Sequence, residues 1–205
     1  MLKIIRYGAW AAVAVLAFFT LAVGLGWLVT DGPGRMQRER ASGIPDIGGA
    51  FTMTNHRGET VTDRDIQGKP TLIFFGFTSC PEVCPTTLSD ISGWLQDLGP
   101  DADRLNVLFV SVDPERDTVE QLANYVSLFD QRIVGLTGTP DQLAAMAKVY
   151  RVYYRKVPLE EGGYTMDHSA MVYMMDARGR FVGTIDYHEA RELALPKLRR
   201  LLERS

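Results

Sequence analysis

The pattern of apolar and polar residues divides the chain into an apolar N-terminal segment, a polar stretch and a region of alternating strands and helices. From Gly8 to Thr30 there is no charged residue, and residues 9–29 are almost all apolar. About 20 apolar residues, each rising about 1.5 Å, span a hydrocarbon core about 30 Å thick. Trp10 and Trp27 lie near the two ends, where aromatic rings suit the membrane interface. We therefore predict an N-terminal transmembrane helix over 9–29, within a membrane anchor of residues 1–30.

The anchor also bears on where the protein resides. A cleaved signal peptide has a shorter apolar region, of about 7–15 residues, followed by a small-x-small cleavage site, and this segment fits neither feature. Arginine and lysine occur on both sides of the segment, so their distribution does not set its orientation. A large domain that follows a single early span is usually translocated, and no Arg- and Ser-rich transit sequence precedes the span. We expect a single-pass protein of the bacterial inner membrane with its C-terminal domain in the periplasm.

Residues 31–45 are polar and rich in Gly, Pro and Arg, which indicates a linker, and residues 46–205 form the predicted domain. Continuous apolar runs at 71–77 and 105–112 are typical of strands buried on both faces. Helical periodicity or a Thr-x-x-Gln capping box predicts helices at 85–98, 118–129 and 139–150. Further strands are predicted at 50–54, 59–62, 133–136, 152–157, 170–176 and 181–186, and a closing helix at 189–204, bent or interrupted at Pro196. This alternation predicts an α/β sandwich.

Composition excludes two classes of protein. Lys and Arg total 22 and Asp and Glu total 25, a net charge of -3, and no basic cluster is interleaved with aromatic residues. A nucleic-acid-binding protein would show such a basic excess. The chain has only 2 cysteines, which rules out a disulfide-rich scaffold. The two lie four positions apart, at Cys80 and Cys84, and we interpret them as one local site.

Cys80 and Cys84 follow the first central predicted strand, which is the thioredoxin-like placement of a cysteine motif. Pro85 suits the first turn of a helix, so Cys84 is expected at the helix entrance and Cys80 on the loop before it. The partial positive charge of a helix N-terminus favours the thiolate, which is both the nucleophile and the metal-binding form. The pair therefore supports either disulfide chemistry or metal binding, and a purely structural disulfide is a third interpretation.

The residue that faces the cysteines favours metal binding. The spacing is C-x-x-x-C, whereas thioredoxin-type oxidoreductases have C-x-x-C and a cis-proline before the strand that faces it. Here that strand is predicted to begin near Ala170 and is preceded by His168, which in isolation would be read as an ordinary hydrogen-bonded histidine. Two thiolates and an imidazole form a soft ligand set that suits copper, Cu(I) especially, whereas zinc usually requires a fourth ligand.

Other candidate residues have simpler interpretations. We interpret His56 as a solvated residue of a hairpin turn and His188 as a surface residue near the last helix. Glu82 is an exposed loop charge or a weak extra ligand, and the segment Asp113–Asp117 shapes a strand-to-helix connection. Among the methionines Met171, Met174 and Met175, core packing is expected for at least two.

The sequence resembles the Sco/SenC family of copper-binding proteins that assist cytochrome c oxidase assembly. The segments that carry the resemblance are Gly76–Pro85, Ser111–Thr118, Gly135–Gly138, Ala147–Tyr154 and Asp167–Ser169. The resemblance implies a thioredoxin-like fold that faces the periplasm or intermembrane space. It also implies that the two motif cysteines and the later histidine ligate copper, which here are Cys80, Cys84 and His168. Many members have Asp at the position of Glu82, so the role of this carboxylate stays open.

The function implied by the resemblance is that of a copper metallochaperone, with Cu(I) or Cu(II) delivered to the dinuclear copper site of cytochrome c oxidase subunit II. The alternatives are a thiol–disulfide reductase that keeps the target's cysteines reduced and a copper or redox sensor. We expect no enzymatic activity beyond an accessory thiol–disulfide reductase activity, in which Cys80 and Cys84 form a disulfide when oxidised. Expected partners are subunit II, the membrane, and a second periplasmic copper chaperone or thiol reductase.

Overall fold

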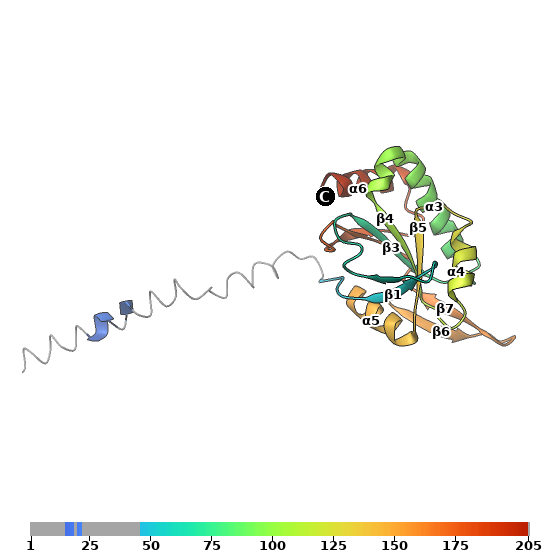
Figure 1. The fold of residues 1–205 in the computed structure, drawn as a ribbon, viewed down its shortest axis with the longest axis horizontal. Coiled ribbons are helices and arrows are strands. Elements are labelled where there is room, and N and C mark those ends of the chain that lie inside the picture. The colour runs from blue at the N-terminus through green and yellow to red at the C-terminus, as the bar shows by residue number, and fades with distance from the viewer. Residues whose placement is uncertain (1–14, 19, 22–45, 205) are drawn as a thin grey trace, which may run out of the picture. The chain divides into compact units, whose positions relative to one another are not determined.

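The computed structural model describes residues 15–18, 20–21 and 46–204. Of the predicted anchor it describes only 15–18 and 20–21, which are helical, and the predicted linker 31–45 lies outside the described residues. Among the residues described, none of the helices combines the length and the apolar character needed to cross a membrane. The chain divides into two units, 1–44 and 45–205, and the second contains every strand named below (Figure 1).

A seven-stranded sheet with the order β2-β1-β5-β4-β3-β8-β9 forms the centre of the domain. Its strands are β1 (Thr52–Asn55), β2 (Thr60–Thr62), β3 (Thr71–Gly76), β4 (Asn106–Ser111), β5 (Ile133–Thr137), β8 (Val172–Met175) and β9 (Phe181–Ile185). Strands β3, β4 and β5 are parallel, whereas β1 pairs antiparallel with β5 and β8 pairs antiparallel with β3. All six residues of β3 are buried, as its continuous apolar run predicts for a strand covered on both faces.

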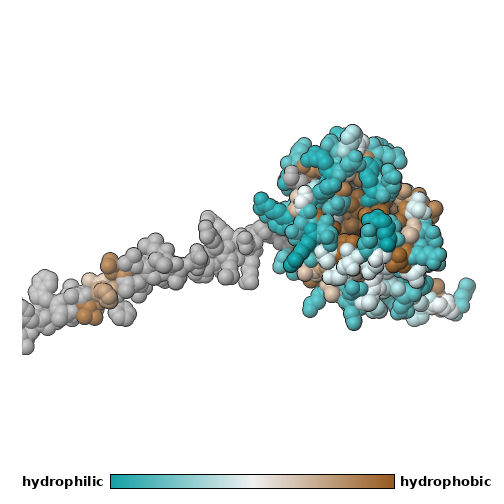
Figure 2. All heavy atoms as spheres, in the orientation of Figure 1, coloured by the Kyte–Doolittle hydropathy of each residue, from teal (hydrophilic) through white to brown (hydrophobic). Residues whose placement is uncertain are grey.

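The helices are α3 (Val83–Leu98), α4 (Val119–Val126), α5 (Pro140–Tyr150) and α6 (Arg191–Glu203), with a 3-10 helix η1 (Gly99–Arg104) after α3. Helix α3 contacts α6, α4 contacts β5, and α5 contacts β1. Figure 1 shows α3 and α6 on one side of the sheet and α5 on the other. The surface in the same view is mainly hydrophilic around a central apolar area (Figure 2). This is the α/β sandwich that the sequence predicts.

The capping residues predicted for α4 and α5 are found at the starts of these helices, whereas α3 and α6 differ from their predictions. Thr139 and Gln142 form the predicted capping box at the start of α5, and the Thr118 hydroxyl accepts the N–H of Gln121 at the start of α4. Helix α3 begins at Val83, two residues before the predicted start. Helix α6 runs through Pro196 without interruption, because Ala194, Leu198, Leu201 and Leu202 are buried on one of its faces and offset the lost hydrogen bond.

One hairpin differs from the sequence prediction. Strands β6 (Tyr154–Pro158) and β7 (Tyr164–His168) form a separate two-stranded sheet. The strand predicted at 152–157 begins two residues later, and β7 was not predicted at all. Most side chains of both strands are exposed or only partly buried, so their sequence lacks the apolar alternation by which a strand is recognised. This hairpin matters for function because its last residue is His168.

Candidate metal centre

The two cysteines lie where the central strand β3 leads into helix α3. Cys80 is on the loop and is partly buried, whereas Cys84 is in the first turn of α3 and is fully buried. Both are free thiols, and the backbone N–H of Cys84 points at the Sγ atom of Cys80 at 3.4 Å. An amide at a helix N-terminus stabilises negative charge, so this loop favours a thiolate at Cys80.

Gly76, the last residue of β3, makes room for the Cys84 thiol. A Cβ atom at this position would lie 2.7 Å from Cys84 Sγ and 2.7 Å from Cε2 of Phe109. Both distances are shorter than any ordinary contact of a Cβ atom. A glycine is therefore required here for close approach, and the sequence gives no direct signal of it apart from its place just before the cysteine loop.

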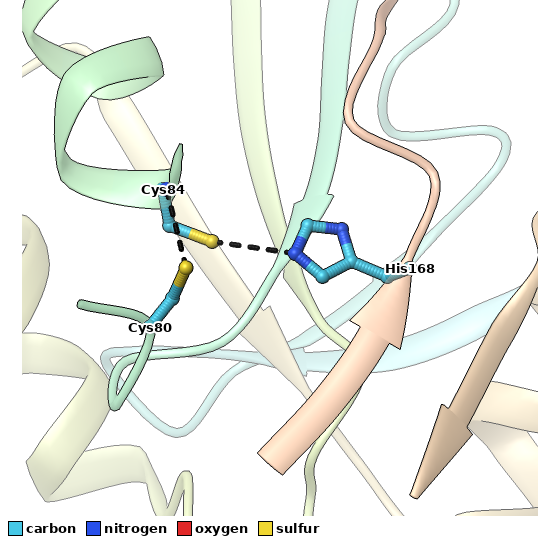
Figure 3. Close-up of side chains that lie close together, drawn as sticks. All are labelled: Cys80, Cys84 and His168. Carbon is cyan, nitrogen blue, oxygen red and sulfur yellow. Dashed lines mark hydrogen bonds between the residues drawn. The ribbon is translucent and has the colours of Figure 1, made fainter. Parts of the chain in front are cut away.

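His168 reaches the cysteines from the end of β7 (Figure 3). Its Nδ1 atom lies 3.0 Å from the carbonyl oxygen of Ser169. Because a carbonyl only accepts hydrogen bonds, Nδ1 carries a proton, and in the neutral ring Nε2 then offers its lone pair. Nε2 lies 3.6 Å from Sγ of Cys84. The rings of Phe74 and Phe77 pack edge-on against the imidazole, with centroids at 6.3 Å and 5.7 Å, and keep it in this orientation.

Because the two thiols are close together, the pKa of Cys80 is lowered and the pKa of Cys84 is raised. A hydrogen bond from Cys84 is the main effect that lowers the pKa of Cys80 to about 4, and burial opposes it. The same bond, together with burial, raises the pKa of Cys84. The first proton is therefore lost from Cys80, and the remaining proton is held on Cys84.

The three candidate ligands converge on one point. One ligand atom each of Cys80, Cys84 and His168 lies within 4.8 Å of the others. Two sulfurs and one imidazole nitrogen form a soft donor set, and such a set fits Cu(I) better than the oxygen-preferring cations. Glu82 is exposed and does not belong to this group.

The residues interpreted as poor ligands lie outside the group. His56 differs from its interpretation as a solvated residue, because its Nδ1 atom accepts the N–H of Gly135 at 3.0 Å, and burial lowers its pKa. His188 is exposed, as predicted for a surface residue, and packs against the ring of Tyr187. Met174 and Met175 are buried in the core, as predicted for at least two of the three methionines.

Comparisons with known proteins identify the family of this chain. Residues 39–203 match the family model described as SCO1/SenC. The mitochondrial protein SCO1 homolog of Homo sapiens is 43% identical over 152 residues, which is 71% of this chain and 50% of that protein. Protein SenC of Rhodobacter capsulatus is 35% identical over 187 residues, covering 91% of this chain and 83% of that protein. The chain thus spans about half the length of the human relative.

Solved structures give the same result. The structure of Bradyrhizobium japonicum ScoI with copper bound is 50% identical, with a TM-score of 0.71, and covers 76% of this chain and 99% of that one. The predicted thioredoxin-like fold is therefore confirmed as the fold of Sco proteins. The match to the family model covers most of the domain and includes both cysteines and His168. This chain belongs to the SCO1/SenC family.

Proposed function

We propose that this chain is a copper metallochaperone that carries copper on Cys80, Cys84 and His168 and delivers it to the dinuclear copper site of cytochrome c oxidase subunit II. The observation that carries the proposal is the convergence of the three ligand atoms within 4.8 Å. The copper-bound ScoI structure, at 50% identity, supports copper as the cargo. Delivery to subunit II rests on the family resemblance.

The site combines secure binding with access for a receiving protein. Cys80 provides a thiolate, and Cys84 releases its proton when a metal binds, so that both sulfurs can serve as ligands. In its neutral form His168 offers the lone pair of Nε2 toward Cys84. Cys84 is fully buried, whereas Cys80 and His168 are partly exposed. The thiolates of a partner can therefore replace the ligands stepwise from the exposed side, which is how a soft metal passes between proteins without being released.

The proposed location places this exchange at the membrane. The apolar segment 9–29 anchors the chain in the bacterial inner membrane as a single span, and the domain lies in the periplasm. An anchored chaperone meets an oxidase subunit of the same membrane at a high effective concentration, so a modest interface between them suffices.

A second function is supported by the acidity of Cys80. A thiolate at neutral pH on a partly exposed loop is a competent nucleophile. Cys80 would attack one sulfur of a disulfide in the target and release the other as a thiolate. Cys84 would then attack Cys80 in the mixed disulfide and release the second thiol of the target. Two electrons pass to the target, and a Cys80–Cys84 disulfide is left.

The two functions are separated by the need for His168. The full chain, purified in detergent, is loaded with Cu(I) and mixed with a metal-free subunit II domain whose copper-binding cysteines are reduced. We expect copper to move to subunit II, and His168→Ala to abolish the transfer. In a parallel reaction the metal-free chain is mixed with subunit II in its disulfide form. Reduction of that disulfide by wild type and by His168→Ala alike, without any copper transfer by wild type, would favour the reductase.

A further inference from the structure

A buried aspartate holds the loop that carries Cys80. Asp117 is fully buried, and its carboxylate accepts the backbone N–H of Thr78 at 3.0 Å and the Thr78 hydroxyl at 2.7 Å. It also accepts the hydroxyl of Ser111, at the end of β4, at 2.6 Å. Thr78 lies two residues before Cys80, so Asp117 ties the cysteine loop to the neighbouring strand.

The same segment holds the hairpin that carries His168. The hydroxyl of Tyr164, the first residue of β7, donates to Asp113 at 2.9 Å. The guanidinium of Arg116 pairs with Asp113, donates to the carbonyl of Tyr164 at 2.9 Å, and lies over the Tyr164 ring at 3.9 Å. Lys156 on β6 adds an exposed pair with Glu115 at 2.7 Å, which contributes little.

We infer that the segment Asp113–Asp117 is a bracket that sets the position of the Cys80–Cys84 loop relative to His168. Asp117 holds the cysteine loop through Thr78. Asp113 and Arg116 hold the hairpin that carries His168 through Tyr164. This inference rests on the proposed copper site. It assigns positioning roles to Asp117 and Tyr164, neither of which contacts the candidate ligands in the hydrogen bonds described.

The topology explains why a bracket is needed. The cysteines follow β3 of the main sheet, whereas His168 ends a hairpin whose strands pair only with each other. Backbone pairing with the main sheet therefore does not fix the position of the imidazole, and side-chain contacts have to do so. Residues that orient metal ligands through hydrogen bonds typically alter metal affinity by about 10-fold to 100-fold when they are replaced.

The first test uses the metal-free full chain in detergent and measures amide hydrogen exchange by mass spectrometry. Asp117→Asn turns one acceptor into a donor and is expected to speed exchange in residues 77–84 but not in the hairpin. Tyr164→Phe removes one hydroxyl and keeps the ring beneath Arg116, and it is expected to speed exchange in the hairpin but not in residues 77–84. Thr78→Val, which removes only the hydroxyl bond, is the milder variant should Asp117→Asn fail to fold.

Two matched variants control for general destabilisation. Asp176→Asn replaces another buried aspartate that accepts backbone N–H groups, in the turn between β8 and β9. Tyr153→Phe removes a hydroxyl that donates to Asp167 at the His168 end of the hairpin, whereas Tyr164 lies at the turn end. Neither residue has a hydrogen bond to Asp113–Asp117. We expect exchange in residues 77–84 to stay unchanged in Asp176→Asn, and exchange around Tyr164 to stay unchanged in Tyr153→Phe.

The second test measures Cu(I) affinity and counts sulfur and nitrogen ligands by X-ray absorption. We expect Asp117→Asn and Tyr164→Phe each to lower the affinity about 10-fold or more, and Tyr164→Phe to weaken the nitrogen contribution while both sulfurs remain. Unchanged exchange in both segments, in variants that are folded, would overturn the bracket. If wild type binds no copper but the exchange pattern is as expected, the proposed function fails and the bracket stands.

Discussion

The Nε2 atom of His168 lies 3.6 Å from the Sγ atom of Cys84, although 84 positions separate the two residues in the chain. The sulfur is held at the start of α3, and the imidazole at the end of a hairpin outside the main sheet. The site therefore exists only when the domain is packed, and changes in packing around it should alter metal binding as well as stability.

Gly76→Ala is the sharpest test of this packing. The added methyl group would lie 2.7 Å from Cys84 Sγ and from the Phe109 ring, so one of them has to move. Overpacking of this kind costs about 1–3 kcal/mol of unfolding free energy. We expect a loss in this range in urea unfolding of the full chain, together with weaker Cu(I) binding because the Cys84 sulfur is displaced.

Gly93→Ala is the matched control. Gly93 lies within α3, and a Cβ atom there would meet nothing within 4 Å. Alanine favours the helix over glycine by about 0.5–1 kcal/mol, so this variant should be at least as stable as wild type and bind copper equally well. Equal stability of the Gly76 and Gly93 variants would show that the Cys84 thiol is not confined as described.

The acidity of Cys80 predicts an unusual pH dependence of its reactivity. A thiolate reacts with iodoacetamide, and the reactivity of an ordinary cysteine falls about tenfold for each pH unit below its pKa of about 8.5. The pKa of Cys80 is lowered to about 4, chiefly by the hydrogen bond from Cys84. Its alkylation rate in the reduced, metal-free chain should therefore stay level from about pH 8 to about pH 5 and fall only as the pH approaches the lowered pKa.

Cys84→Ala tests the cause of this acidity. The variant lacks the side chain that donates to Cys80, so the pKa of Cys80 should rise and its alkylation should slow on acidification well before wild type does. A wild-type rate that already falls tenfold between about pH 7 and about pH 6 would contradict a lowered pKa.

The capping box of α5 does not involve the metal site, so its loss should change stability without changing copper binding. Thr139 and Gln142 satisfy each other's backbone N–H groups at the start of this helix. Thr139→Ala should lower the unfolding free energy by about 1 kcal/mol, measured by urea unfolding, and leave Cu(I) affinity unchanged. Thr139→Ser keeps the hydroxyl and should recover most of the loss. Equal losses in the two variants would mean that the hydroxyl is not the stabilising group.

Much of the fold could be predicted because its signals are local. The buried runs of β3 and β4 and the cap of α5 are visible in short stretches of sequence. Strand β7 could not be predicted, because it pairs only with β6 and buries only one of its side chains fully, so its sequence shows no apolar alternation. His168 could nevertheless be predicted as a ligand, because it precedes the strand that is expected to face the cysteines.

The supporting residues of the site were harder to predict. Asp117 lies in a charged segment that is interpreted from the sequence as a strand-to-helix connection, and its side chain is fully buried against Thr78 and Ser111. A buried carboxylate is recognised only when its hydrogen-bond donors are known, and Thr78 is 39 positions away. Gly76 is required by a contact with Cys84 that exists only in the folded chain.

The Cu(I) affinity of the reduced full chain, measured in detergent by competition with a chelator of known affinity, tests the central claim most directly. We predict tight binding of about one copper per chain, since the three converging ligand atoms form one site. His168→Ala and the double variant Cys80→Ser/Cys84→Ser should each lose much of the affinity. His56→Ala, which replaces a histidine outside the site, should retain it. Weak binding by wild type, or an affinity unchanged by His168→Ala, would contradict the three-ligand copper site.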